Sequence, residues 1–146
     1  MRRTGKQKNK GCLIGCLVFI ALWVVVTVIG AIVGPSRLRQ TQETAALKDI
    51  QNIQAAATRY QAQFGRYPES LDEMGSHGGF TPTYIGSGIQ DGYEFTLQGG
   101  PEVYTLNANP LATNVIARRT FYTDQTQVVR ENQSLEPASA ASSARH

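Results

Sequence analysis

The pattern of hydrophobic and polar positions begins with an unbroken apolar stretch near the N-terminus. From Gly11 to Gly34, no Asp, Glu, Lys, Arg or His interrupts the sequence. A helix needs roughly 20 apolar residues to cross a hydrocarbon core of about 30 Å, and this stretch is long enough to do so. An ordinary buried helix rarely has so long an apolar run. The pattern therefore predicts a transmembrane helix over residues 12–34.

A second pattern, with helical periodicity, occupies residues 36–64. Apolar side chains recur three and four positions apart, which places them on one face of a helix. The members of this face are Ala46, Ile50, Ile53, Ala57, Tyr60 and Phe64. Polar residues such as Asp49 and Gln54 lie mostly off it. Gly65, followed by Pro68, ends the pattern as a helix C-cap does. We predict that the apolar face is buried.

The remaining residues favour turns and short strands. Residues 65–92 are rich in glycine, which predicts a loop. Residues 93–130 contain short runs of strand-forming residues separated by turn residues, which predicts an antiparallel sheet. Helix 36–64 can cover the apolar face of that sheet, giving an α+β fold with one helix on one sheet. Residues 132–146 contain one Leu and no aromatic residue, and they are predicted to be a disordered tail beyond an outward domain over residues 35–131.

Charge orients the predicted span. The leader, residues 1–11, has no acidic residue and contains the basic residues Arg2, Arg3, Lys6, Lys8 and Lys10. Basic residues favour the cytoplasmic side, so the N-terminus is predicted to be cytoplasmic and the C-terminal domain periplasmic or extracellular. The net charge of +3 comes from this leader. It indicates contact with membrane lipid and does not indicate a nucleic-acid partner.

Two features of the apolar stretch leave alternatives open. A secretory signal peptide would explain its position, but such peptides have shorter apolar regions and end at an A-x-A-like site, whereas this stretch ends at Gly34-Pro35-Ser36. We therefore expect the segment to be retained. Pro35 removes a helical hydrogen bond, so either a kinked helix or two separate helices would fit this position.

Residues that could carry chemistry are scarce. The two cysteines, Cys12 and Cys16, lie in the apolar stretch, where we interpret them as small residues that allow close helix packing. A metal or acylation site is the alternative for this pair. The two histidines, His77 and His146, have no cysteine, phosphate-binding loop or metal-ligand spacing beside them. We predict no catalytic residue, no metal, no cofactor and no enzymatic activity.

Together, these features resemble type IV pilin-like proteins, most closely the pseudopilins of type II secretion. The resemblance covers about residues 10–130. It rests on the basic leader ending at Lys10-Gly11, the apolar stretch directly after it, Pro35, the amphipathic helix and the turn Gly65-Arg66-Tyr67-Pro68. It implies a pilin-like fold, with a long N-terminal helix packed on the sheet, and peptidase cleavage between Gly11 and Cys12.

The resemblance has one departure, at the start of the mature chain. The family usually has Phe at the first mature position and Glu at the fifth, where this chain has Cys12 and Cys16. The family glutamate is thought to neutralise the terminal amine of a neighbouring subunit in the apolar filament core. The resemblance therefore implies a minor or accessory subunit of a type IV pilus or a type II secretion pseudopilus-like filament.

The implied location is the bacterial inner membrane, with a single pass. The implied partners are other pilin-like subunits or proteins of the secretion machinery. An alternative from the same features is an unprocessed single-pass membrane protein whose outward domain is a binding module.

Overall fold

The computed structural model describes residues 10–76, 87–114 and 116–145, with the backbone alone described for residues 10–17 and 31–35. The chain divides between residues 37 and 38 into two units. Helix α1, Lys10–Phe64, contributes to both units. The predicted leader falls largely on residues 1–9, which lie outside the described residues.

Helix α1 continues through the position of Pro35. The sequence leaves open whether a kinked helix or two helices occur there, and the structure has one helix at this position. An interior proline removes one backbone hydrogen bond. The residues on both sides of Pro35 remain helical despite this loss.

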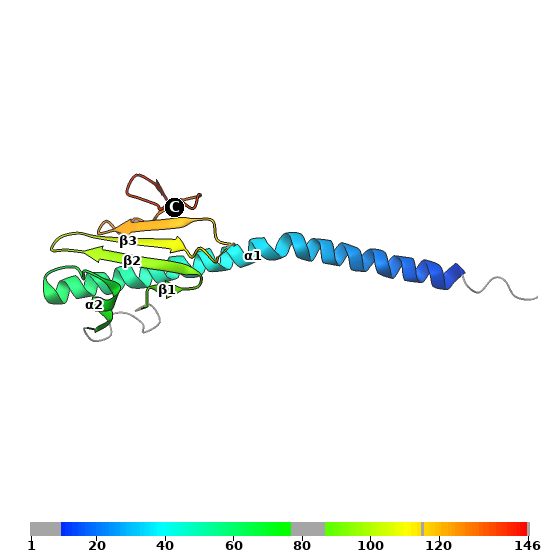
Figure 1. Ribbon diagram of the computed structural model, residues 1–146, viewed down its shortest axis with the longest axis horizontal. Helices are drawn as coiled ribbons and strands as arrows, with labels where there is room; N and C mark the ends of the chain where they lie inside the picture. Colours follow the sequence, from blue (N-terminus) through cyan, green and yellow to red (C-terminus); the bar gives the residue numbers. More distant parts are fainter. Residues whose placement is uncertain (1–9, 77–86, 115, 146) are drawn as a thin grey trace, which may run out of the picture. The chain divides into compact units, whose positions relative to one another are not determined.

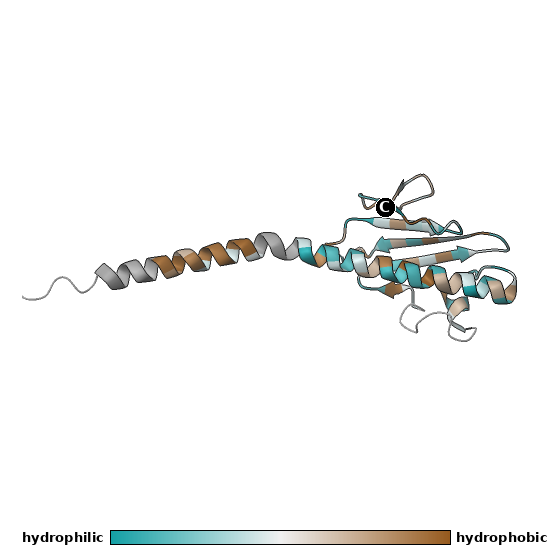
Figure 2. Cartoon of the chain, turned by 180° about the vertical axis from the view of Figure 1, so that it is seen from behind, coloured by the Kyte–Doolittle hydropathy of each residue, from teal (hydrophilic) through white to brown (hydrophobic). Residues whose placement is uncertain are grey.

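The sequence predicts that the apolar part of α1 spans a membrane. The apolar residues whose side chains are described run from Val18 to Ile29, and the ribbon of this segment is mostly brown in Figure 2. Within the described residues, no helix contains an apolar run long enough to cross a bilayer. This finding contradicts the predicted transmembrane, single-pass protein and the predicted location in the inner membrane, so both predictions are wrong.

The second unit is an α+β structure. It contains the rest of α1, helix α2 (Leu71–Ser76) and a six-stranded sheet. The strands are β1 (Ile89–Gln90), β2 (Tyr93–Gly99), β3 (Tyr104–Pro110), β4 (Thr120–Asp124), β5 (Arg130–Asn132) and β6 (Ser143–Ala144). They pair in sequence order, and every pair is antiparallel (Figure 1). The predicted α+β class and the antiparallel sheet are therefore confirmed.

The core lies between α1 and one face of the sheet. Tyr93, Phe95 and Leu97 alternate with exposed residues along β2, so one face of this strand is buried. The same core contains five members of the predicted helix face, Ala46, Ile50, Ile53, Ala57 and Tyr60, each at most 1% exposed. This burial is the main source of stability in the unit, at about 1.5–3 kcal/mol for a large apolar side chain.

Phe64 departs from that face. Its side chain is 41% exposed, although its ring packs against that of Tyr60 with centroids 4.4 Å apart. Phe64 is the last residue of α1, and the chain turns at Gly65 with a positive φ of 72°. The helical period places Phe64 in line with the core residues, but the chain leaves the helix at this position and the ring is covered only in part.

The predicted loop and tail contain more structure than expected. The loop 65–92 includes α2 and β1, while residues 77–86 lie outside the described residues. In the predicted tail, β6 pairs with β5, and the backbone N–H of Arg145 donates to the carbonyl of Val129 at 2.9 Å. Ala138 is buried. The prediction of a disordered tail is corrected, because these contacts use backbone groups and a small side chain and need little hydrophobicity.

Candidate functional site

The most unusual surface of the described chain is the apolar segment, which we define as Val18–Ile29 of α1. Its large side chains are between 49% and 79% exposed, with Phe19 and Trp23 the most exposed. Successive helical residues point in directions about 100° apart, so an uninterrupted apolar sequence covers all sides of the helix. The exposed members are Val18, Phe19, Ile20, Leu22, Trp23, Val24, Val25, Val26, Val28 and Ile29.

The hydroxyl group within this segment is internally satisfied. Thr27 donates its hydroxyl hydrogen to the carbonyl of Val24 at 2.8 Å, within the same helix. A hydroxyl bonded in this way can be buried at lower cost than one without a partner. The segment is therefore suited on all sides to apolar surroundings.

The predicted processing junction, Gly11 and Cys12, lies at the start of α1, where the structure describes the backbone alone. His77 lies outside the described residues. Among the side chains that are described, no group of three or more His, Cys, Asp or Glu residues is placed to hold a metal ion.

Three polar side chains of α1 lie in the interface with the sheet, where the sequence pattern gave no signal for them. Glu43, Asp49 and Gln54 are each at least nine-tenths buried. Gln54 donates to the hydroxyl of Thr123 at 2.7 Å and to the carbonyl of Gln127 at 3.2 Å. The prediction that Gln54 lies off the buried face is wrong, because β4 and the turn after it cover this side of the helix.

Asp49 differs from Gln54 in lacking such a bond. Its Oδ2 atom has no hydrogen-bond partner among the described residues. Desolvation raises the pKa of its carboxyl group, the charge of Asp91 raises it further, and Lys48 acts in the opposite direction. The direction of this shift reflects the cost of burying the charge of the carboxylate at this position.

A charge network joins α1 to the end of the chain. Arg119 lies 3.4 Å from a carboxylate oxygen of Glu43 and 3.9 Å from one of Glu131, and Arg145 lies 2.7 Å from the same Glu131 oxygen. Glu43 is on α1, Glu131 is on β5, and Arg145 follows β6. The network therefore holds the C-terminal strands against the helix. Its charges are neutralised within the unit.

A second polar cluster lies where α1 ends and α2 begins. Glu73 pairs with Arg66 and accepts a hydrogen bond from Tyr60 at 2.9 Å. Its backbone N–H donates to the hydroxyl of Ser70 at 3.1 Å, and the backbone N–H of Glu69 donates to its carboxylate at 2.6 Å. These bonds cap the start of α2. The hydrogen bond from Arg66, followed by the one from Glu69, lowers the pKa of Glu73 to about 2.

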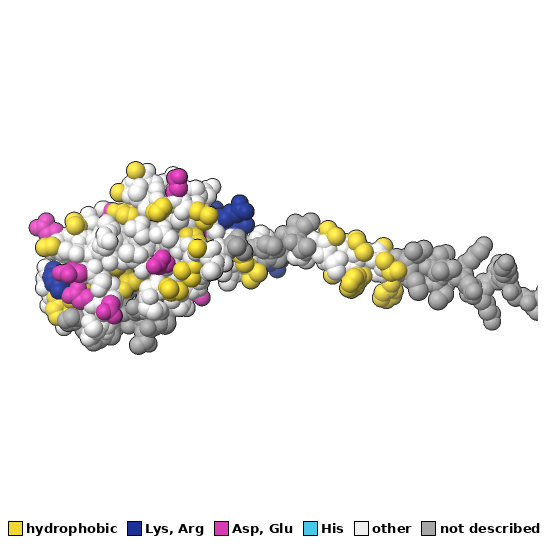
Figure 3. Space-filling view, viewed as in Figure 1, with side chains coloured by type: hydrophobic (Ala, Val, Ile, Leu, Met, Phe, Trp, Pro, Cys, Tyr) yellow, Lys and Arg dark blue, Asp and Glu magenta, His cyan; other side chains and the backbone are white. Residues whose placement is uncertain are grey.

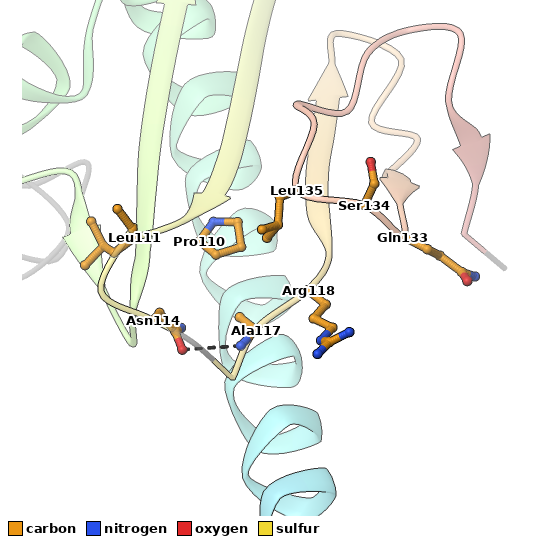
Figure 4. A pocket seen from close by; sticks show the side chains of 9 residues that line it. Pro110, Leu111, Asn114, Ala117, Arg118, Gln133, Ser134 and Leu135 are labelled. Carbon is orange, nitrogen blue, oxygen red and sulfur yellow. Dashed lines mark hydrogen bonds between the residues drawn. The ribbon is translucent and has the colours of Figure 1, made fainter.

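A surface groove lies at the end of β3, and we call it the basal groove. Its volume is about 710 Å³. Figure 4 shows Pro110 and Leu135 beside one another there, with Arg118 at the edge. Leu135 is 69% exposed. The groove is lined by Pro110, Leu111, Ala112, Asn114, Ala117, Arg118, Gln133, Ser134 and Leu135. It combines an apolar floor with one positive charge.

Comparisons of the chain with models of protein families, with curated proteins and with solved structures return no significant match. The descriptions pilin-like, pseudopilin and type II secretion protein therefore have no support from any relative. Its function is therefore argued from three features of its surface, which are the apolar segment, the basal groove and the charges around the second unit.

Proposed function

We propose that the protein is a structural subunit of a filament and that its apolar segment is covered by the apolar helices of neighbouring subunits. The filament would be of the type IV pilus or pseudopilus-like kind, with this chain as a minor or accessory subunit. The observation that carries the proposal is the exposure of apolar side chains from Val18 to Ile29 on all sides of one helix.

Exposed apolar surface of this extent favours association. Burying one Val, Leu, Ile or Phe side chain contributes about 1.5–3 kcal/mol. Association costs about 4–15 kcal/mol in lost translational and rotational freedom. Burial of several of these side chains offsets that cost, and patches of this kind mark interaction surfaces in proteins.

The second unit supports the same proposal by contrast. Its own core buries the apolar faces of α1 and of the sheet against each other. A domain with its own core, joined to an exposed apolar helix, is suited to assembly. The helix would contact neighbouring subunits, and the domain would lie on the outside of the filament. The basic leader and the Lys10-Gly11 junction add the sequence resemblance that motivates the type of filament.

Photo-cross-linking in cells that produce the full chain tests the proposal. A photoreactive phenylalanine analogue replaces Trp23, which is 72% exposed in the apolar segment. We expect covalent products with a second protein chain, in which the modified peptide maps to an apolar N-terminal helix of that chain. The partner can be a copy of this protein or another subunit that has an apolar N-terminal helix.

The matched control places the same analogue at Gln51, which is exposed on α1 in the second unit. Gln51 should give far less product, because its face of the helix is polar. Attachment of Trp23 to lipid alone, or equal products from Trp23 and Gln51, would contradict a filament held by the apolar segment.

The processing junction provides a second, independent test. A leader with five basic residues would be costly to place in an apolar filament core, so assembly implies its removal. N-terminal sequencing and intact mass of the assembled protein should find Cys12 as the first residue. Recovery of only the uncut chain in cells with an active pilin peptidase would contradict a processed filament subunit.

A further inference from the structure

The turn between β2 and β3 is a rigid projection that carries exposed groups. We call residues 100–103 the hairpin tip. Within it, the N–H of Gly100 donates to the carbonyl of Val103, and the N–H of Tyr67 donates to the carbonyl of Gly100, both at 2.9 Å. Glu102 is exposed, and Val103 is 54% exposed. The tip thus presents one negative and one apolar side chain from a hydrogen-bonded frame.

The basal groove presents the complementary pair. Its floor includes the apolar side chains of Pro110 and Leu135, and its edge carries the guanidinium group of Arg118. The neighbouring Arg119 pairs with Glu43 and Glu131. Among the described residues, neither Arg118 nor Glu102 has an ion-pair partner.

The tip and the groove lie at opposite ends of the same strand. Strand β3 begins at Tyr104, next to the tip, and ends at Pro110, which lines the groove. At about 3.4 Å per residue, the two sites are about 20 Å apart along the strand. In Figure 1, β3 runs from the left end of the sheet towards its right end. In Figure 3, several acidic side chains and one basic patch lie at the left end of the second unit, and a basic group lies at its right end.

We propose that the basal groove of one copy receives the hairpin tip of a second copy. Glu102 of one chain would pair with Arg118 of the other, while Val103 would cover Pro110 and Leu135. This inference rests on the proposed function, since it names the contact between the second units of neighbouring subunits. Charge complementarity selects a second copy as the occupant, because the chain itself supplies both halves of the pair.

The geometry allows this contact to repeat from one copy to the next. The two sites are on opposite ends of one unit, so a chain cannot satisfy both with itself. Each copy that binds through its tip leaves its own groove free for the next. Contacts between different patches, repeated without closing a ring, place copies in an open row, so two or more copies of this accessory subunit would adjoin within the filament. The tip is already ordered in the single chain, which reduces the conformational entropy lost on binding.

Disulfide trapping tests the contact in the full chain. Two chains are produced together, both with Cys12→Ser and Cys16→Ser, one with Val103→Cys and the other with Leu135→Cys. After mild oxidation in the producing cells, we expect a disulfide-linked dimer that contains one chain of each kind. Chains that carry Val103→Cys alone, or Leu135→Cys alone, should give little dimer.

Charge exchange then tests the pair itself. In this trapping background, Glu102→Arg or Arg118→Glu alone should lower the yield of the mixed dimer roughly tenfold. In the double exchange, the chain with the tip cysteine carries Glu102→Arg and the chain with the groove cysteine carries Arg118→Glu. This combination should restore most of the yield of the mixed dimer. Glu94→Arg, at an exposed position of β2, is the matched control and should leave the yield unchanged. All exchanged residues are exposed, and a melting curve for each variant shows whether it is folded.

The outcomes separate this inference from the proposed function. Loss of the mixed dimer with intact Trp23 cross-links would overturn the groove contact and leave the filament helix in place. A mixed dimer without Trp23 cross-links would support the contact and contradict the helix-based assembly. No mixed dimer, dimers between identical cysteine positions only, or no recovery on double exchange would each overturn the inference.

Discussion

Helix α1 has two parts that differ in whether their apolar side chains are buried. Between Ala46 and Tyr60, the apolar residues recur on one face, and those in contact with the sheet are at most 1% exposed. Between Val18 and Ile29, they are continuous, and half or more of most large side chains is exposed. The comparison shows that a periodic pattern can be satisfied within one chain, whereas a continuous one leaves surface for another molecule to cover.

The largest expected effect comes from placing a charge in each part. Ile53→Asp should unfold the second unit, since burying an unpaired carboxylate costs about 4 kcal/mol or more. Val25→Asp, at a position that is 53% exposed, should leave the melting temperature of the second unit unchanged and should abolish the Trp23 cross-links. Circular dichroism melting curves of both variants provide the comparison. Equal destabilisation by the two changes would mean that the two parts of α1 do not differ as described.

A smaller effect is expected from the polar side of the buried helix face. Gln54→Ala removes hydrogen bonds to Thr123 and Gln127 and leaves the buried hydroxyl of Thr123 without this donor, so it should cost about 1–3 kcal/mol of unfolding free energy. Gln51→Ala, at an exposed position of the same helix, should change it by about 0.5 kcal/mol or less. Chemical denaturation of the two variants measures the difference. A neutral Gln54→Ala would show that the interface with the sheet is wholly apolar in its energetics.

The C-terminal strand should contribute still less. Removing residues 137–146 deletes the pairing of β6 with β5, the buried Ala138 and the ion pair of Arg145 with Glu131, and we expect a loss of about 1–2 kcal/mol. Leu135→Ser should be almost neutral, because this side chain is 69% exposed. Melting curves test both. An unchanged melting temperature after the deletion would restore the view of a tail without structural role.

The smallest effect concerns pH. Arg66 and the backbone of Glu69 hold the pKa of Glu73 at about 2, below its ordinary value of 4.5. The folded state therefore prefers the ionised carboxylate, and this stabilisation is complete above about pH 5 and is lost as the pH falls towards 2. Glu73→Gln should melt earlier than the native chain at neutral pH, and the gap should close on acidification. A gap that is constant from about pH 6 to pH 2.5 would contradict the ionised pair.

Local patterns predicted much of this architecture. The spacing from Ala46 to Tyr60 predicted the buried helix face, and the strand-forming runs between residues 93 and 130 predicted the antiparallel sheet. Both succeed because side-chain direction follows from backbone period, which is a local property. The length of the apolar run was a poorer guide, and the membrane span predicted from it was contradicted.

Long-range contacts account for what these patterns missed. Gln54 is buried because residues 123 and 127 reach it from across the sheet, and Phe64 is exposed because the chain turns away at Gly65. The basal groove brings Pro110 and Leu135 together from distant positions in the chain. No period in the sequence encodes such neighbours.

The sequence by itself determined the periodic helix face, the strands and the continuous apolar segment, since each depends on neighbours along the chain. The tertiary structure alone decided which polar side chains enter the interface, how β6 joins the sheet and where the exposed Glu102 and Arg118 lie. The physical reason is that burial and charge pairing depend on which distant segment covers a residue, and that is settled only when the chain is folded.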